Sequence, residues 1–186
     1  GDDQKQHVEL TRDLAERFNA RYGTAFTVPI PVIQKETARI YDLQNPTAKM
    51  SKSAESDAGV LWLLDDPSVS AKKIMRAVTD NDGSVRYDRE SKPGVSNLLT
   101  IYAALTGRQI PSIEDEYAGR GYGDFKKGLA EVVVNEFGPV RQRALELLAD
   151  PAELDRVLAS NATRADEVAD ATLADVYDKV GLLRRG

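Results

Sequence analysis

The sequence predicts a mainly α-helical fold in which the last part of an α/β unit is followed by a helical bundle. Three observations predict it. Near the N-terminus, a helical pattern leads into a β-branched stretch with two prolines and then into a lysine- and serine-rich loop, an order typical of the end of an α/β unit. After residue 67, apolar residues recur at helical spacing and no convincing strand pattern follows. With 186 residues the chain can hold one domain and part of another, and we place the boundary between 1–67 and 68–186.

The first part opens with a predicted helix over 5–21. Its apolar residues recur every fourth position and predict a stripe that faces a core: Leu10, Leu14, Phe18 and Tyr22. Asp2 or Asp3 is placed to cap this helix, because a carboxylate accepts hydrogen bonds from the free N–H groups of a first turn. Gly23 is placed to end it. The following stretch, 26–33, is rich in β-branched residues, but its two prolines confine it to a sheet edge or an irregular strand.

After the lysine- and serine-rich loop comes a short apolar run, 60–64, which favours a core position for Trp62. A helix is expected over 68–79 with a cap at Ser68 or Ser70, since serine side chains accept from free N–H groups. Turn-forming residues fill 80–84, a polar loop follows to residue 93, and a helix over 95–105 ends at Gly107.

The last 75 or so residues are predicted to form long helices. A helix that starts at Ser112 is broken by the glycines of 119–123, and a long helical pattern covers 122–148. Within that pattern, Gly138-Pro139 predicts a kink or an interruption, because proline removes a helix hydrogen bond. Asp150-Pro151 then begins a final helix that reaches residue 180.

The chain is organised around the loop Lys49-Met50-Ser51-Lys52-Ser53. Asn45-Pro46 just upstream is a turn signal, so the two lysines are expected on a loop. Two ammonium groups, serine hydroxyls and backbone N–H groups are the donors that suit a polyphosphate. An arbitrary pair of lysines three apart is usually a solvated surface loop, but five consecutive residues that match a catalytic motif favour a phosphate site.

The composition excludes several other classes of site. No cysteine is present, which rules out disulfides, thiolate metal sites and a cysteine nucleophile within this chain, and the single histidine, His7, is expected to be solvated. No apolar run is long enough to span a bilayer and the N-terminus carries no signal sequence, so the cytoplasm is the expected compartment. The net charge of −5 argues against a general nucleic-acid coat. Any RNA contact must come from local basic residues, for which the candidates are Lys126, Lys127, Arg141, Arg143, Arg184 and Arg185.

With these residues in view, the chain resembles the bacterial tryptophanyl-tRNA synthetases. The motifs that carry the resemblance are the segment 1–7 (Gly-Asp-Asp-Gln-Lys-Gln-His), Ile40, the loop 49–53, and the segments 72–80 and 94–99. The loop by itself indicates only a class I aminoacyl-tRNA synthetase, whereas the segment 1–7 points to the tryptophan enzymes. The resemblance implies that 1–67 is the C-terminal part of a Rossmann-type catalytic domain and that 68–186 is a helical, anticodon-binding-like domain.

The resemblance also implies an activity and roles for individual residues. The family activates L-tryptophan with ATP, releasing pyrophosphate, and transfers it to tRNA(Trp), with Mg²⁺ beside the phosphates. Gly1, Asp2 and Asp3 would lie against ATP with Asp3 on the ribose, Gln4 near the amino acid, and Ile40 on the adenine. Lys49 and Lys52 would be the catalytic residues that hold the pyrophosphate half, within an ATP-binding loop completed by Met50, Ser51 and Ser53. The resemblance implies no protein-held metal, and a homodimer for the full-length enzyme.

One departure from the family limits this interpretation. The family has an upstream His-x-Gly-His signature that meets the ATP phosphates, and a chain with one histidine cannot contain it. The chain also lacks an initiator methionine, and we expect it to be the C-terminal part of the enzyme and inactive alone, because half an ATP site cannot be preorganised. Two alternatives stay open: a non-catalytic helical RNA-binding or interaction module that keeps a vestigial phosphate loop, and the related tyrosine-specific synthetase.

Overall fold

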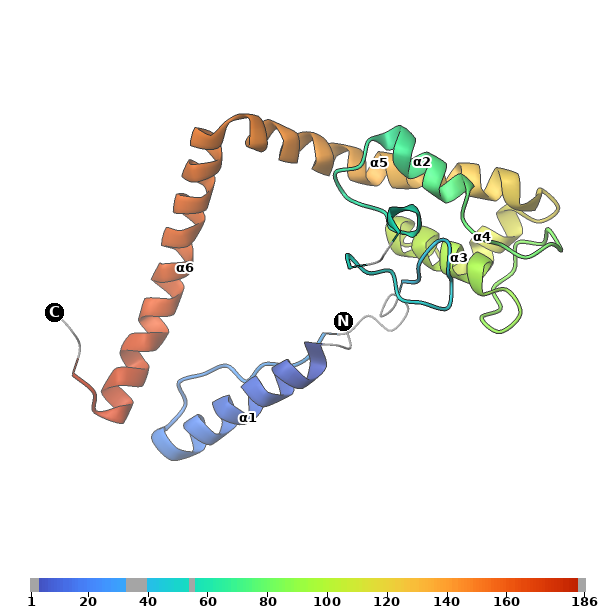
Figure 1. The fold of residues 1–186 in the computed structure, drawn as a ribbon. Coiled ribbons are helices and arrows are strands. Elements are labelled where there is room, and N and C mark those ends of the chain that lie inside the picture. The colour runs from blue at the N-terminus through green and yellow to red at the C-terminus, as the bar shows by residue number, and fades with distance from the viewer. Residues whose placement is uncertain (1–3, 33–39, 54–55, 184–186) are drawn as a thin grey trace. The chain divides into compact units, whose positions relative to one another are not determined.

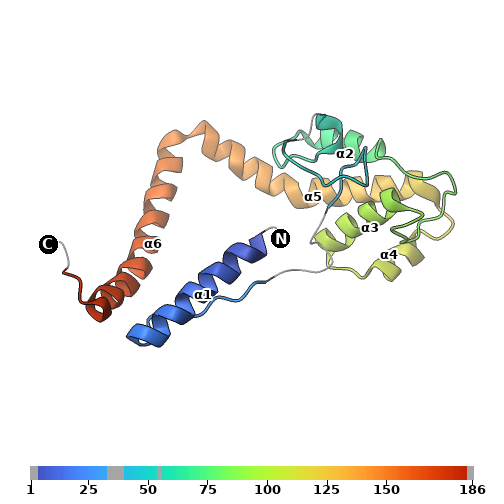
Figure 2. The same cartoon turned by 60° about the horizontal axis from the view of Figure 1, so that its bottom comes forward.

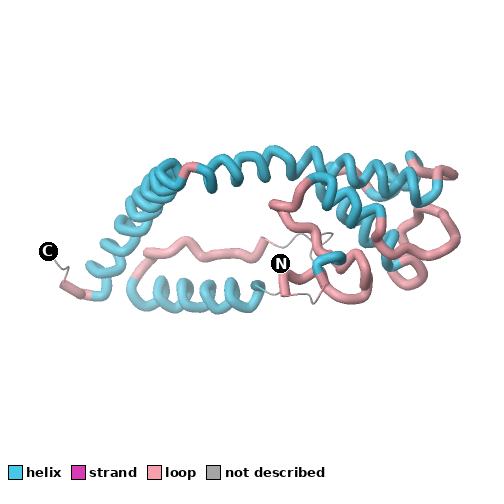
Figure 3. The backbone as a smooth tube through the Cα atoms, turned by 45° about the horizontal axis from the view of Figure 1, so that its top comes forward, coloured by secondary structure: helices cyan, strands magenta, loops and turns pink. Residues whose placement is uncertain are grey.

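The computed structural model describes residues 4–32, 40–53 and 56–183, and these are mainly α-helical, as predicted (Figure 1). The chain divides into two compact units, one made of 1–34 and 147–186 and the other of 35–146. Figure 3 shows helices joined by loops and turns, and no strand occurs within the described residues. The predicted domain boundary between residues 67 and 68 stays a prediction.

The unit 35–146 holds the buried core. It contains α2 (Pro67–Met75), α3 (Pro93–Thr106), α4 (Ile110–Glu116) and the larger part of α5 (Gly121–Ala149). These helices lie together in both Figure 1 and Figure 2. α3 is at the centre, because every residue from Gly94 to Tyr102 is buried. Apolar side chains of all four helices form the core, with Ile74, Val95, Leu98, Leu99, Ile113, Phe125, Leu129 and Val133 among those at most 1% exposed.

Aromatic rings fix the packing of α3, α4 and α5 against one another. The rings of Tyr102 and Phe125 are stacked, with centroids 6.3 Å apart, and Tyr117 meets Phe125 edge to face at 5.3 Å. Offset stacked and edge-to-face arrangements are the favourable ones for aromatic pairs. Gly128 makes room for this cluster, since a Cβ there would lie 2.0 Å from the Tyr117 hydroxyl.

The other unit contains α1 (Lys5–Tyr22) and α6 (Pro151–Val180). Gly23 ends α1 with φ 88, a left-handed conformation that favours glycine. The side chain of Asn19 then turns the chain, because its Oδ1 accepts from the backbone N–H groups of Ala25 and Phe26 and its Nδ2 donates to the Phe26 carbonyl. α6 begins as predicted at Asp150-Pro151, where the Asp150 carboxylate accepts from the Glu153 N–H at 3.0 Å.

Three predictions for 1–34 fail or fall outside the described residues. The apolar stripe of the first helix is largely exposed, with Leu10 at 61% and Leu14 at 58%, because periodicity identifies an apolar face but not a partner for it. The described residues of the expected strand, 26–32, form no ladder, since alternate prolines remove its donors and no described segment pairs with it. The capping residues Asp2 and Asp3 lie outside the described residues.

Predictions for residues 60–148 also need correction. Trp62 is 40% exposed and not in the core, because its indole N–H donates to the Asp57 carboxylate at the surface. α2 is capped by Asp66 instead of a serine and ends earlier than expected, at Met75. α4 has no side-chain cap at Ser112, since its first turn begins with Ile110. Pro139 lies within α5 without interrupting it, so of the two predicted outcomes only the kink stays a prediction.

Candidate phosphate-binding loop

The lysine-rich loop is carried by a short irregular hairpin. Tyr41 and Lys49 form an antiparallel bridge, framed by hydrogen bonds from the Asp42 N–H to the Ala48 carbonyl and from the Met50 N–H to the Ile40 carbonyl, both 2.9 Å. Between these bonds the chain reverses at 44–47, as the Asn45-Pro46 signal predicts. Lys49 is therefore held at the end of a closed turn.

The Asp42 carboxylate and two serine hydroxyls order this hairpin. Asp42 Oδ1 accepts from the N–H groups of Gln44 at 2.7 Å and Asn45 at 3.0 Å, an Asx-type turn. In the motif itself, Ser51 Oγ lies 2.9 Å from Ser53 Oγ and accepts from the Ser53 N–H at 3.3 Å. The serines thus bend the chain between the two lysines.

The two lysines face solvent, and the described residues offer neither of them a carboxylate partner. Met50, which lies between Lys49 and Ser51, is half-buried and packs against the core together with Ile40. This alternation places the apolar side chain inward and the cations outward, where an anionic ligand can reach them. Uncompensated ammonium groups on an ordered turn are suited to bind phosphate oxygens.

The upstream end of the loop is anchored in the core through Leu43. Leu43 is 2% exposed, its N–H donates to the Gly59 carbonyl at 3.0 Å, and its carbonyl accepts from the Val78 N–H at 2.8 Å. Gly59 is required here, because a Cβ at this position would lie 1.9 Å from Asp42 Oδ1. The two ends of the segment 43–59 are therefore bonded directly to each other, and the motif projects from a closed base.

The downstream end is anchored by Lys73 of α2. Its ammonium donates to Asp65 Oδ2 at 2.8 Å, to Asp57 Oδ2 at 2.9 Å and to the Val60 carbonyl at 2.9 Å. Burial lowers the pKa of Lys73, but the bonds to Asp65 and Asp57 outweigh burial and raise the pKa above its ordinary value. Lys73 thus stays charged and fastens the segment after the motif to α2.

Comparison with known proteins identifies the family. The family model described as tRNA synthetases class I (W and Y) matches residues 1–138, which is most of the chain. The chain belongs to this family. Among relatives, the tryptophan–tRNA ligase of Leifsonia xyli is 67% identical over 99% of this chain and 55% of its own length, and that of Mycobacterium leprae is 55% identical over 98% and 53%. The chain therefore spans about half the length of the curated relatives it matches.

Solved structures of tryptophanyl-tRNA synthetases are also similar to this chain in fold. The tryptophanyl-tRNA synthetase of Mycoplasma pneumoniae matches 98% of this chain and 56% of its own chain, with a TM-score of 0.81 and 36% identity. The Campylobacter jejuni enzyme, solved in complex with ADP and tryptophan, covers the same shares with a TM-score of 0.64 and 32% identity. These findings confirm the class I synthetase resemblance and the mainly helical fold expected of this part.

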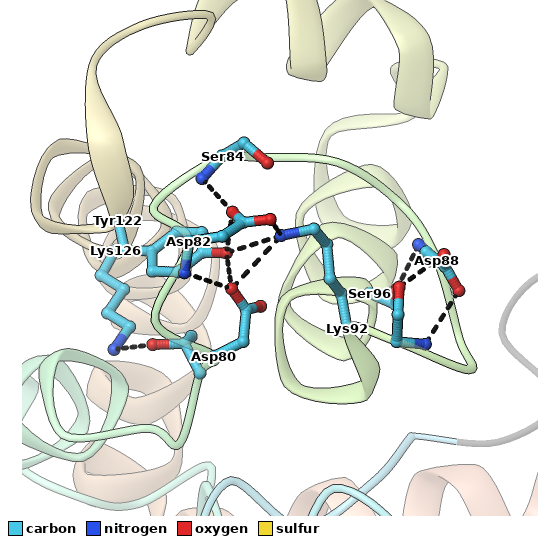
Figure 4. A network of polar contacts seen from close by, with 10 residues as sticks. Asp80, Asp82, Ser84, Asp88, Lys92, Ser96, Tyr122 and Lys126 are labelled. Atoms are coloured by element: carbon cyan, nitrogen blue, oxygen red, sulfur yellow. Dashed lines mark hydrogen bonds and ion pairs between the residues drawn. The ribbon is translucent and has the colours of Figure 1, made fainter.

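A second polar network in this class I synthetase chain joins the loop after α2 to α5 (Figure 4). Lys92 Nζ lies 3.2 Å from Asp80 Oδ1 and is also paired with Asp82, and the Tyr122 hydroxyl donates to Asp80. Asp80 also accepts from the Asp82 N–H at 3.0 Å, so these aspartates form a turn, as predicted. Burial raises the pKa of Tyr122 to about 12, helped by its bond to Asp80. The network fixes the start of α3.

Only some of the other predicted site residues lie within the described part of the chain. Gly1, Asp2 and Asp3 lie outside the described residues, and Gln4 is exposed at the start of α1 in the unit that does not contain the loop. Ile40 lies beside the loop, and its carbonyl is occupied by the Met50 N–H. Their roles toward ATP and tryptophan stay predictions.

The predicted basic patch is only partly available to RNA. Lys126 is 9% exposed and donates to the Ala77 carbonyl at 2.8 Å and to Thr79 Oγ1 at 3.2 Å, so this candidate for an RNA contact is buried and already hydrogen-bonded. Arg141 Nε donates to the Leu64 carbonyl at 3.3 Å, and Arg143 pairs with Glu146 at 3.4 Å. Lys127 is exposed, and Arg184 and Arg185 lie outside the described residues.

Proposed function

We propose that this chain is part of a tryptophan–tRNA ligase, which activates L-tryptophan with ATP and transfers the aminoacyl group to tRNA(Trp). The observation that carries the proposal is the ordered hairpin that presents Lys49 and Lys52 to solvent without carboxylate partners among the described residues. The relatives support the choice of amino acid, because the curated ones are named tryptophan–tRNA ligases and one solved neighbour holds ADP and tryptophan.

The chemistry assigns the lysines a role in the activation step. The tryptophan carboxylate attacks the α-phosphorus of ATP, a carboxylate oxygen–phosphorus bond forms, and the bond from phosphorus to the bridging oxygen breaks. Negative charge then accumulates on the leaving pyrophosphate. Ammonium groups held in place before the reaction stabilise this charge where it develops, without a cost of reorganisation. The hydrogen bonds that hold the hairpin and the segment after it support this role for Lys49 and Lys52.

The remaining ATP contacts follow from the family resemblance. Gly1, Asp2, Asp3 and Ile40 would bind the nucleoside part, Met50, Ser51 and Ser53 would complete the phosphate loop, and Gln4 would contact tryptophan. Mg²⁺ is bound in such reactions mainly by substrate phosphates and water, so a cage of protein ligands is not required.

The assembly and the compartment are inferred on the same basis. We infer a homodimer for the complete enzyme and a cytoplasmic location. Among the described residues, no helix combines the length and the apolar composition of a membrane span.

ATP–pyrophosphate exchange tests the proposal. The chain would be assayed alone and after fusion to the part of the Leifsonia xyli ligase that it does not match, with each amino acid in turn. We expect exchange only in the fused protein and only with tryptophan. Exchange by the chain alone would overturn our inference that it is inactive by itself.

The other outcomes of this assay decide between the alternatives. Exchange driven by tyrosine instead of tryptophan would assign the chain to the tyrosine-specific relatives. A fused protein that folds but exchanges with no amino acid would favour a non-catalytic RNA-binding module. Protection of Lys49 and Lys52 from amine labelling by ATP in the fused protein supplies an independent measure, because it reports binding without turnover.

A further inference from the structure

Asn97 of α3 holds the arm of the hairpin that lies opposite Lys49. It is 3% exposed and lies 56 residues from its partner, Tyr41. Its Oδ1 accepts from the Tyr41 N–H at 2.9 Å, and its Nδ2 donates to the Tyr41 carbonyl at 2.8 Å. One side-chain amide thus satisfies both backbone polar groups of one loop residue.

The position of Tyr41 in the hairpin connects this contact to Lys49. Tyr41 stands opposite Lys49 in the antiparallel bridge, but the framing hydrogen bonds are made by its neighbours Asp42 and Ile40. In such a non-hydrogen-bonded pair, the N–H and carbonyl of each residue point away from the partner strand. The Asn97 amide takes the place that a third strand would occupy, and it fixes the residue directly across from the first catalytic lysine.

The rest of α3 makes this anchor rigid. Val95, Leu98 and Leu99 around Asn97 are at most 1% exposed and belong to the core. A side chain on a packed helix has few alternative positions. The Asn97 side-chain amide is therefore held in place by the core, and it holds the hairpin in a fixed position relative to the core. No other described side chain bonds both backbone groups of a hairpin residue.

We infer that Asn97 is a positioning residue that sets the location of Lys49 for pyrophosphate binding. The expected effect on pyrophosphate exchange rests on the proposed function, whereas the expected effect on the order of the hairpin does not. Electrostatic stabilisation depends on groups fixed before the reaction, and a displacement of about 1 Å can cost on the order of 10²-fold in rate. Asn97 therefore acts on Lys49 through Tyr41.

The first test is amide hydrogen exchange on this 186-residue chain. In Asn97→Ala, the Tyr41 and Met50 amides should exchange faster, while the amides of Leu98 and Phe125 in the core should change only with global stability. The matched control is Thr100→Val, which removes a hydroxyl that is equally buried on α3 and bonds only to the Ser96 carbonyl of the same helix. Equal effects of both substitutions on the loop amides would overturn the inference.

The second test is pyrophosphate exchange in the fused protein. Asn97→Ala should lower kcat by about 10- to 100-fold and leave the KM for tryptophan within about 2-fold, whereas Thr100→Val should change neither by more than about 2-fold. Parallel losses in kcat and in tryptophan affinity would contradict a role through Lys49. If Asn97→Ala does not fold, Asn97→Asp replaces it, because it keeps the shape and the acceptor but cannot donate to Tyr41 when ionised.

The two tests distinguish failure of the proposed function from failure of the positioning role of Asn97. If the unsubstituted fused protein shows no exchange with tryptophan, the proposed function fails, and hydrogen exchange still decides whether Asn97 orders the hairpin. If the unsubstituted protein is active and Asn97→Ala behaves like Thr100→Val in both tests, the proposed function stands and the positioning role is wrong.

Discussion

Lys73 and Asp65 form a nearly buried ion pair, with 2.8 Å between Nζ and Oδ2 and side chains that are 9% and 17% exposed. The pair lies where the segment after the lysine loop returns to α2. Removing one partner of such a pair lowers the free energy of unfolding by more than the intact pair contributes to it, because the remaining charge is left desolvated and without a partner.

Lys73→Met should therefore lower the free energy of unfolding by about 1–3 kcal/mol, as for loss of a hydrogen-bonded charged group. Urea denaturation followed by circular dichroism measures this. The double variant Lys73→Met, Asp65→Asn should recover part of the loss, because the unpaired carboxylate is gone. Strictly additive effects of the two substitutions would show that the pair is not coupled.

Gly94→Ala should destabilise the protein by about 1–3 kcal/mol through overpacking. A Cβ at this position would lie 2.1 Å from the Val78 carbonyl oxygen, and a backbone atom held by a neighbouring hydrogen bond cannot move away easily. The matched control is Gly123→Ala in the first turn of α5, where no atom beyond its chain neighbours and its own helix backbone lies within 4 Å of the added Cβ. That control should be neutral or stabilising by up to about 1 kcal/mol, since alanine favours helix over glycine. The prediction would be wrong if both substitutions had the same sign.

Stability should fall in acid as the network around Lys92 loses its charges. The pKa of Asp82 is held well below its ordinary value, 3.8, by its bonds to Lys92 and to the Ser84 N–H. A carboxyl group with a lowered folded-state pKa contributes stability above its unfolded pKa and loses it as the pH falls toward the folded value. Asp82→Asn should thus lower the urea midpoint at pH 7, and the difference from the unsubstituted protein should shrink below about pH 4.

The control for this pH dependence is Asp155→Asn on the exposed side of α6. It should leave the urea midpoint nearly unchanged at both pH values, as most surface substitutions do. A difference between Asp82→Asn and the unsubstituted protein that stayed constant from pH 7 to pH 2 would count against the proposed origin.

Lys52→Ala in the fused protein should lower the rate of pyrophosphate exchange by about 10²–10³-fold, the usual loss for one preorganised electrostatic donor. The KM for tryptophan should change little, because the charge that Lys52 meets develops on the leaving group. Lys127→Ala, which removes an exposed lysine of α5, is the control and should have no effect on exchange. Comparable losses in turnover and tryptophan binding would argue that Lys52 acts on the ground state.

Three helix boundaries and the lysine loop were predictable because their signals are local. Gly23, Gly107 and Asp150-Pro151 mark boundaries that depend on φ angles and capping within a few residues, and the structure confirms them. The loop 49–53 is found from five adjacent residues for the same reason. The fold class followed from the period of the apolar residues after position 67.

Contacts between distant segments were not predictable in this way. Lys126 and Lys127 are neighbours with the same charge, and only packing decides that the first is buried against Ala77 and that the second is exposed. Asn97 carries no local signal at all, because its partner is 56 residues away. The exposed Leu10 and Leu14 show the converse, since an apolar stripe in the sequence does not say what covers it.

The closed base of the hairpin has a consequence for proteolysis. Trypsin needs an accessible lysine, and the exposed Lys49 and Lys52 meet that need better than the buried Lys73 and Lys126. A nick at Lys52 would nevertheless leave the two pieces together, since Leu43 stays bonded to Gly59 and Val78 across the cut. The cleaved protein should migrate as one species in native gels and as two under denaturing conditions, and a bound polyphosphate should slow the cut.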